Sequence, residues 1–175
     1  MRYNGRMIGS VDLLVLLKVC SKGDSPWDQA QIAWDLFVSQ STVSMSLRRA
    51  AEVRLYSPSL RRVNATGLQE ALIHGAKYFL APIRGGITVG MPTCWAVSPF
   101  KGRIVPSDEL PPVWPDPEGT VRGLSFEPLY RTAPKAAALD AGFYELLAIV
   151  DVLRDGRPRE VAMAKDELAK RLCVR

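Results

Sequence analysis

Hydrophobic residues recur at helical spacing in two segments of the amino-terminal half of the chain. The first predicted helix covers residues 11–21, after Ser10 as a capping residue, and Gly23 suits the left-handed conformation that follows a helix. The second predicted helix covers residues 65–80. Its single apolar stripe consists of Leu68, Leu72, Ala76 and Phe79. Each helix is therefore expected to bury one face in a core.

The segment Ser25–Ala51 lies between these two helices and predicts two short helices with a tight turn. Ser25 is a favourable N-cap and Pro26 suits the first helical position, which predicts a helix over Pro26–Asp35. Residues 36–38 form the predicted turn. Ser39 then caps a second helix over Gln40–Glu52.

The second of these short helices has two unlike faces. At 100° per residue, its apolar side consists of Val43, Leu47 and Ala50. The opposite side consists of Ser41, Met45 and Arg48, flanked by Ser44 and Arg49. Hydroxyl, thioether and guanidinium groups suit contacts with base edges and phosphates, whereas the apolar side suits packing on the preceding helix.

The sequence VSQSTVSMSLRRA within this segment resembles the recognition helix of bacterial winged helix-turn-helix regulators, including MarR-like proteins. The resemblance is strong over Ser25–Ala51 and extends weakly to a preceding helix over Ser10–Ser21. It implies a DNA-binding transcriptional regulator. Such motifs often carry glycine where this chain has Phe37. Because an aromatic residue at positive φ costs about 1–2 kcal/mol, we expect the turn to be built differently.

Residues 54–63 predict a short two-stranded wing after the second helix. The segments 54–56 and 60–63 are compatible with strands, and Ser57, Pro58 and Ser59 favour a turn between them. Arg61 and Arg62 would then lie near the tip, within reach of phosphates or a minor groove. The alternative is a solvated basic loop.

The pattern changes at Pro82, where glycine and β-branched residues become frequent. We predict strands near Ile87–Val89 and Cys94–Val97. The glycines match neither a phosphate-binding loop nor a dinucleotide fingerprint, so turns or close packing explain them better.

Residues 98–117 contain six prolines, which excludes a helix, but they are too apolar for a disordered linker. We expect an extended segment across the body of the protein with Trp114 buried, followed by a strand at Arg122–Phe126. The alternative is a partner-binding surface.

Two amphipathic helices are predicted at the carboxyl end. Asp140 caps the first, over residues 141–154, and Pro158 opens the second, over residues 158–172, so that they form an αα-hairpin. The predicted fold is mainly α with a small β component. It comprises a winged helix-turn-helix domain at residues 1–80 and an extension at residues 81–175 for dimerisation or partner binding.

Positive charge is concentrated in the half that contains the predicted recognition helix. The 175-residue chain has a net charge of +5, with ten basic and six acidic residues in residues 1–80 against thirteen and twelve in the remainder. Five arginines fall between residues 48 and 63, with Glu52 as the single acid there. This distribution favours a polyanionic partner for that segment.

The sequence lacks the usual signals of catalysis. It has one histidine, no nucleophile motif, no metal-ligand spacing and no nucleotide loop, so we expect no enzyme activity, cofactor or metal. Cys20, Cys94 and Cys173 are widely separated and no signal peptide is recognisable, which favours reduced thiols and a cytoplasmic location. No apolar run is long enough to span a membrane.

We therefore expect a sequence-specific regulator that binds double-stranded DNA as a homodimer. The residues expected to contact DNA are Gln40, Ser41, Thr42, Ser44, Met45, Arg48, Arg49, Arg61 and Arg62. Among them, Gln40 suits adenine, Met45 suits a thymine methyl group, and the arginines suit phosphates. The alternative is an autoregulatory antitoxin or interaction module whose carboxy-terminal half binds a protein partner.

Overall fold

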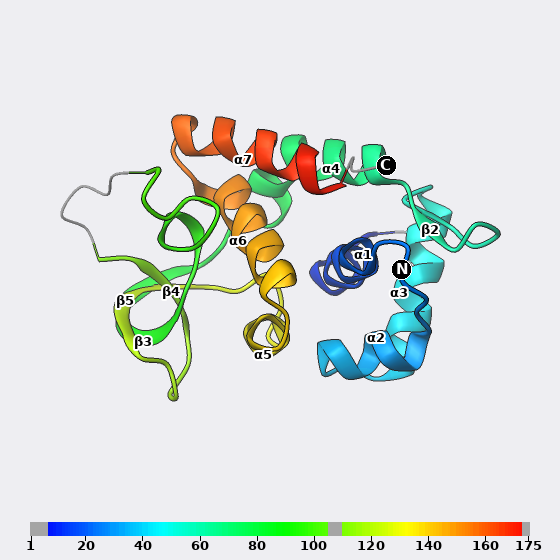
Figure 1. Ribbon diagram of the computed structural model, residues 1–175, viewed down its shortest axis with the longest axis horizontal. Coiled ribbons are helices and arrows are strands. Elements are labelled where there is room, and N and C mark those ends of the chain that lie inside the picture. The colour runs from blue at the N-terminus through cyan, green and yellow to red at the C-terminus, as the bar shows by residue number, and fades with distance from the viewer. Residues whose placement is uncertain (1–6, 105–109, 173–175) are drawn as a thin grey trace, which may run out of the picture.

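The computed structural model describes residues 7–104 and 110–172 and shows a mixed α+β fold (Figure 1). The described part contains seven α-helices, one short 3-10 helix and two small sheets. Of its residues, 55% are helical and 16% are in strands. The expected predominance of helix with a small β component is confirmed. Residues 105–109 of the proline-rich segment lie outside the described part.

The amino-terminal helices are α1 (Ser10–Lys22), α2 (Gln29–Leu36) and α3 (Gln40–Glu52). α3 has the predicted bounds and the predicted cap, since the Ser39 hydroxyl accepts a hydrogen bond from the Thr42 amide. α2 begins three residues later than predicted. Asp28 rather than Ser25 is its N-cap and accepts the Gln31 amide at 2.7 Å. Asp and Ser are about equally good hydrogen-bond acceptors at this position, but the Asp28 carboxylate also places a negative charge at the helix N-terminus, which the helix dipole favours.

The turn between α2 and α3 contains a residue in the left-handed conformation, although an aromatic residue was not expected to adopt it. Phe37 has φ 54° and ψ 43°, and its amide bonds to the last turn of α2. The prediction of a differently built turn was therefore wrong. Leu36 is buried on one side of the turn, and Ser39 caps α3 on the other. Because both neighbours are fixed, the backbone of Phe37 must adopt the strained conformation between them.

The chain continues into a minimal two-stranded ribbon and a long helix. The antiparallel strands β1 (Tyr56–Ser57) and β2 (Arg62–Val63) are shorter than predicted. α4 (Ala65–Phe79) is capped by Asn64 and buries Leu68, Leu72 and Ala76. Phe79 was predicted to continue this apolar stripe, but it is 87% exposed because the helix ends there beyond the core.

Three strands form a small closed sheet: β3 (Arg84–Pro92), β4 (Pro112–Pro115) and β5 (Val121–Phe126). β3 pairs antiparallel with both of the others, which pair with each other in parallel. The predicted strand at Cys94–Val97 is wrong, because Cys94–Ala96 forms a 3-10 helix. Gly90 is needed for close packing, since a Cβ there would lie 2.0 Å from the Trp114 carbonyl oxygen.

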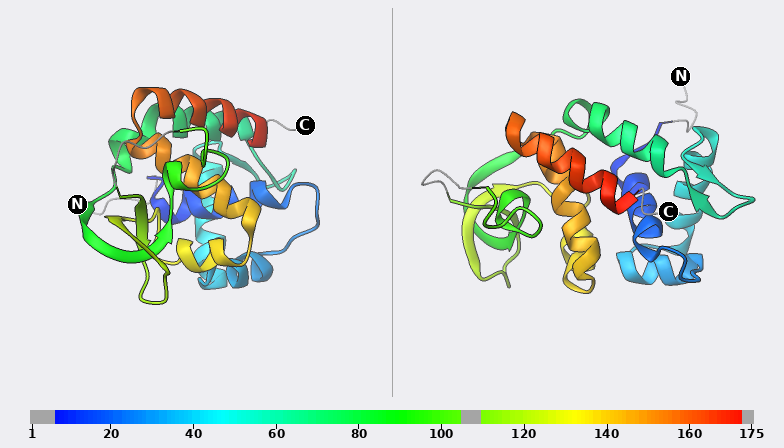
Figure 2. Two further views of the ribbon diagram at one scale, coloured as in Figure 1. Left: turned by 60° about the vertical axis from the view of Figure 1, so that its left-hand side comes forward. Right: turned by 45° about the horizontal axis from the view of Figure 1, so that its top comes forward.

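The carboxy-terminal helices are α5 (Ala133–Ala138), α6 (Ala141–Asp155) and α7 (Pro158–Leu172). α6 and α7 form the predicted hairpin, with Asp140 as the N-cap of α6. α5 was not predicted. α6 is the central element, because it contacts α1, α4, α5 and α7 and so joins the two halves of the chain in one core (Figures 1 and 2).

A buried carboxylate on α6 attaches the sheet to the helices. Asp151 accepts hydrogen bonds from Thr93 and from the indole of Trp114, each at 2.7 Å. Arg154 pairs with it at 2.7 Å and also donates to the backbone carbonyls of Leu80 and Glu127. Burial raises the pKa of Asp151, and Arg154 opposes that effect. Trp114 is fully buried, as predicted.

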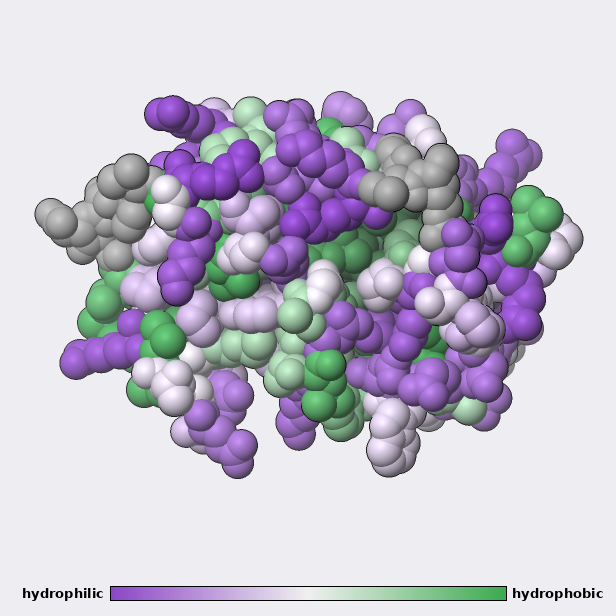
Figure 3. All heavy atoms as spheres, viewed as in Figure 1, coloured by the Kyte–Doolittle hydropathy of each residue, from purple (hydrophilic) through white to green (hydrophobic). Residues whose placement is uncertain are grey.

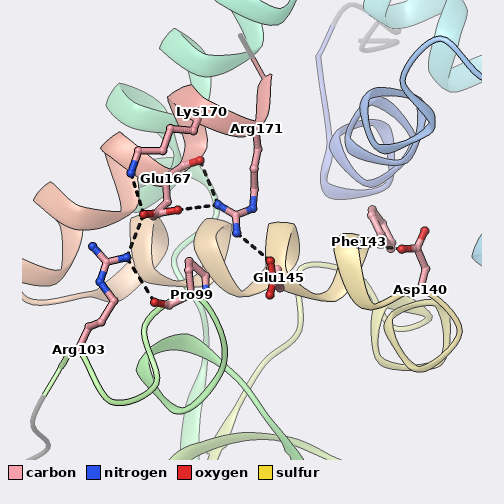
Figure 4. Close-up of polar contacts among 8 residues, drawn as sticks. All are labelled: Pro99, Arg103, Asp140, Phe143, Glu145, Glu167, Lys170 and Arg171. Carbon is pink, nitrogen blue, oxygen red and sulfur yellow. Dashed lines mark hydrogen bonds and ion pairs between the residues drawn. The ribbon is translucent and has the colours of Figure 1, made fainter. Parts of the chain in front are cut away.

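A second ionic network joins α6 and α7, the two helices of the hairpin (Figure 4). The carboxylate of Glu167, on α7, accepts hydrogen bonds from Arg103, Lys170 and Arg171, and Arg171 also reaches Glu145 on α6. Arg103 and then Arg171 lower the pKa of Glu167 from 4.5 to about 2. The network therefore links the segment that follows the 3-10 helix Cys94–Ala96 to the hairpin.

We predict that the stabilising effect of Glu167 depends on acidity. Since the folded pKa lies below the unfolded value, the stabilisation is complete above pH 4.5 and declines as the pH falls from 4.5 towards 2. Glu167→Gln should lower the free energy of unfolding by about 1–2 kcal/mol at pH 7. Urea unfolding of both proteins across this pH range tests the prediction.

The control is Glu118→Gln in the exposed turn between β4 and β5, which should leave the unfolding free energy nearly unchanged throughout. A constant difference between wild type and Glu167→Gln from pH 7 to pH 2 would contradict the assigned role of the network.

Candidate nucleic-acid interface

α3 presents its polar side to solvent over most of its length. Gln40, Ser41, Ser44 and Arg48 are exposed, and Met45 is 49% exposed. The opposite side is buried through Val43, Leu47 and Ala50, which pack against α1 and α2. The predicted division into two faces is thus present. No other described element of the chain covers the polar face.

A buried ion pair fixes the rotation of α3 on α1. Asp12 is 1% exposed, and its carboxylate binds the Arg49 guanidinium through Nη2 at 2.5 Å and Nε at 3.0 Å. Asp12 also accepts the Gly9 amide at 2.9 Å and so completes the start of α1. Because a buried carboxylate needs a cation, Arg49 is directed inwards.

Arg49 consequently differs from its sequence-based assignment. It was expected to contact phosphates beside Arg48, but its charge already neutralises Asp12. The hydrogen bonds with Asp12 raise the pKa of Arg49, and burial of the guanidinium opposes that effect. Arg48 forms no ion pair with any described residue and remains directed to solvent. Arg49 therefore neutralises a buried carboxylate, whereas Arg48 stays exposed to solvent. Their positions in the sequence did not reveal this difference.

Three hydroxyl groups cluster at the beginning of α3. The Ser39 hydroxyl lies 2.8 Å from the Ser41 hydroxyl and 2.7 Å from the Thr42 hydroxyl. Thr42 is half-buried, whereas Ser41 is exposed. Of the two predicted contact residues, Ser41 is the one presented on the open surface, and Thr42 contributes to the cap.

Arg61 and Arg62, expected near the tip of the predicted wing, instead turn back towards the α1–α2 loop. The Arg61 guanidinium donates to the Trp27 carbonyl at 2.8 Å and lies 5.0 Å from the centre of the Trp27 ring. Arg62 pairs with Asp24 at 3.5 Å. Both arginines remain exposed, so the contacts with Trp27 and Asp24 orient them without removing them from solvent.

A cleft of about 600 Å³ adjoins this ribbon on the side facing α6 and α7. It is lined by Arg61, Arg62 and Trp27 on one side and by Asp140, Leu146 and Arg171 on the other. Figure 3 shows the surrounding surface as largely hydrophilic, with apolar atoms deeper between the two halves. The cleft separates the ribbon from the hairpin and leaves the outer side of α3 on a different surface.

Two exposed aromatic residues near α3 were missed by the sequence analysis. Trp34 on α2 is 78% exposed, and Phe37 in the turn is 49% exposed. A signal for Trp34 was available, because the apolar register of α2 runs through Ile32, Ala33 and Leu36 and leaves it outside. Phe37 gave no such signal, since its exposure depends on the left-handed turn.

The described residues include histidine, cysteine and acidic side chains, the residue types that most often bind metal ions. Among them, no group of three or more histidine, cysteine or acidic residues is arranged to hold a metal ion. Burial raises the pKa of the Cys94 thiol well above its usual range, which disfavours the reactive thiolate. Cys173 lies outside the described residues. Within the described ranges, no helix has both the length and the apolarity needed to cross a bilayer.

Comparison with known proteins provides no identification. No family model, no curated protein and no solved structure matches the chain.

We predict that replacing Arg49 lowers the stability of the protein much more than replacing its neighbour Arg48. Arg49→Ala leaves Asp12 buried without its cation and should lower the free energy of unfolding by about 3 kcal/mol. Arg48→Ala removes an exposed side chain and should change it by no more than about 0.5 kcal/mol. Urea denaturation monitored by circular dichroism measures both. Equal losses in the two variants would refute the assigned difference.

Proposed function

We propose that this protein is a sequence-specific regulator that binds double-stranded DNA through a winged helix-turn-helix. In the proposal, α2 and α3 form the helix-turn-helix, α1 supports it from behind, and the β1–β2 ribbon is the wing. The observation that carries the proposal is the uncovered polar face of α3, which includes Ser41, Met45 and Arg48. It is supported by the sequence resemblance and by the surrounding positive charge.

The dimensions of α3 suit a major groove. A helix with its side chains is roughly 10–12 Å in diameter, which matches the width of roughly 12 Å of the major groove, and the thirteen residues of α3 give it a length of roughly 20 Å along the groove. Insertion requires a helix that cannot rotate on its support. The Asp12–Arg49 pair and the buried side chains of α3 provide that rigidity. The exposed amide, hydroxyl and thioether groups in the first turns are then directed towards base edges, with Arg48 further along for a phosphate.

The wing would contribute through charge. Arg61 and Arg62 are held near the α1–α2 loop, yet both are exposed and adjacent to the start of α4. Exposed ion pairs and cation–π contacts are weak, so a phosphate can compete for these guanidiniums. One recognition helix is a small interface, and we propose that two copies bind half-sites roughly 34 Å apart.

The proposal is tested by selecting bound fragments from random duplex DNA and then titrating salt on the selected duplex. Arg48→Ala should weaken binding to all sequences and reduce the salt slope by about one unit, because one phosphate contact is lost. Arg61→Ala should act in the same direction. The matched control is Lys165→Ala, an exposed residue of α7, which should change neither quantity.

If Arg48→Ala and Arg61→Ala both leave affinity and salt slope unchanged, the docking model is wrong. If no sequence is enriched from the random pool, the proposal of sequence-specific binding is wrong as a whole.

Met45 allows a separate test of base recognition. It is the large apolar side chain on the exposed face of α3, so we predict that it contacts a thymine methyl group. Replacing that thymine by deoxyuridine removes only the methyl group and should weaken binding by about 0.8 kcal/mol, or about fourfold. Met45→Ala should bind both duplexes equally. Fluorescence anisotropy provides the measurement, and an unchanged penalty in Met45→Ala would exclude the contact.

A further inference from the structure

A run of large apolar side chains is exposed where α4 leads into β3. Phe79 is 87% exposed, Ile83 72% and Tyr78 69%. On β3, Ile87 is 55% and Val89 43% exposed. Figure 2 shows α4 passing into β3 along one side of the molecule, away from α2 and α3. The segment thus exposes five large apolar residues within twelve positions of the chain.

The structure explains why the fold itself leaves these residues uncovered. The core-facing stripe of α4 ends at Ala76, and the Phe79 ring lies back over Gly75 of its own helix. On β3, Gly90 is buried and Thr88 half-buried, so Ile87 and Val89 point outward from the closed sheet. The helices pack elsewhere, and no described element lies over this outer face.

The exposed area is close to what a stable dimer needs from each subunit. From their exposed fractions, the five residues together expose roughly 600 Å² along the segment from the end of α4 to β3. A standard interface buries about 800 Å² per partner. The polar side chains beside the patch on α4, Glu70, His74 and Lys77, provide a rim for the remainder.

The charges around this surface do not oppose a second copy. Arg84 is paired with Asp155 at the start of β3. The Glu127 carboxylate accepts the Ile83 amide at 3.1 Å, and Lys77 lies 4.6 Å from the ring centre of Tyr78. Both signs are therefore present at the rim. A two-fold arrangement, which brings the same surface of each subunit together, is compatible with such a mixture.

We infer that residues 78–89 form the homodimer interface of this protein, with Phe79 and Ile83 at its centre and a second copy of the same chain as the occupant. The interface lies on α4 and β3, so α3 of each subunit stays uncovered. The inference stands on burial and area and does not depend on DNA binding.

The experiment measures the mass of the full-length protein by light scattering across a range of concentrations. The wild type should have twice the 19.3 kDa of one chain. Phe79→Lys and Ile83→Lys should each give 19.3 kDa. Their circular dichroism spectra and melting curves should match those of the wild type at concentrations low enough for its dimer to dissociate. The matched control is Leu139→Lys, at a residue that is 68% exposed between α5 and α6, which should remain dimeric.

A monomeric wild type, or a dimer that persists in both lysine variants, would overturn the inference. So would equal dissociation of Leu139→Lys. If the protein dimerises through this surface but selects no DNA sequence from the random pool, the proposed function is refuted and the inferred interface is supported. Sequence-specific binding by a protein that is monomeric at every concentration refutes the interface alone.

Discussion

The buried pair of Asp151 and Arg154 holds the parts of this protein together. Both charges lie on the central helix α6, and each is satisfied by groups from distant parts of the chain. The Asp151 carboxylate accepts hydrogen bonds from the indole of Trp114 and the hydroxyl of Thr93. Arg154 donates to the backbone carbonyls of Leu80, directly after α4, and Glu127, directly after β5. A buried pair of this kind is stabilising only if every partner is in place, so it specifies one position of the small sheet on the helices.

The position of α3 follows from the same helix through two further buried charges. Lys18 on α1 binds Asp140 at the start of α6 and lies 3.6 Å from Asp35 on α2. Asp12 on α1 then binds Arg49 on α3. α1 therefore connects the central helix to the proposed recognition helix through ion pairs with specified geometry. A rigid support is what a helix needs if its exposed side chains are to meet base edges in register.

The distribution of exposed groups separates two surfaces with different chemistry. The outer face of α3 is polar and includes Arg48, which forms no ion pair with the residues that the structure describes; such a face suits a charged and hydrated partner such as DNA. The segment from α4 into β3 is apolar with a mixed rim, which suits another protein surface. The proline-rich segment was expected to lie extended across the protein with Trp114 buried, and Trp114 is indeed fully buried in the core. The proposed DNA surface and the proposed dimer surface can thus be occupied together.

The sequence by itself determined the elements whose signals are local. Caps and periodicity specified α3, α6 and α7, because Ser39, Asp140 and Pro158 act within one turn of the helix that they begin. The two-faced character of α3 followed from the same periodicity. Only the tertiary structure decided which charged groups remain available, since Arg49 is taken up by Asp12, a residue 37 positions earlier in the chain. It likewise decided that Phe79 is exposed, because an apolar residue is buried only where another element packs over it.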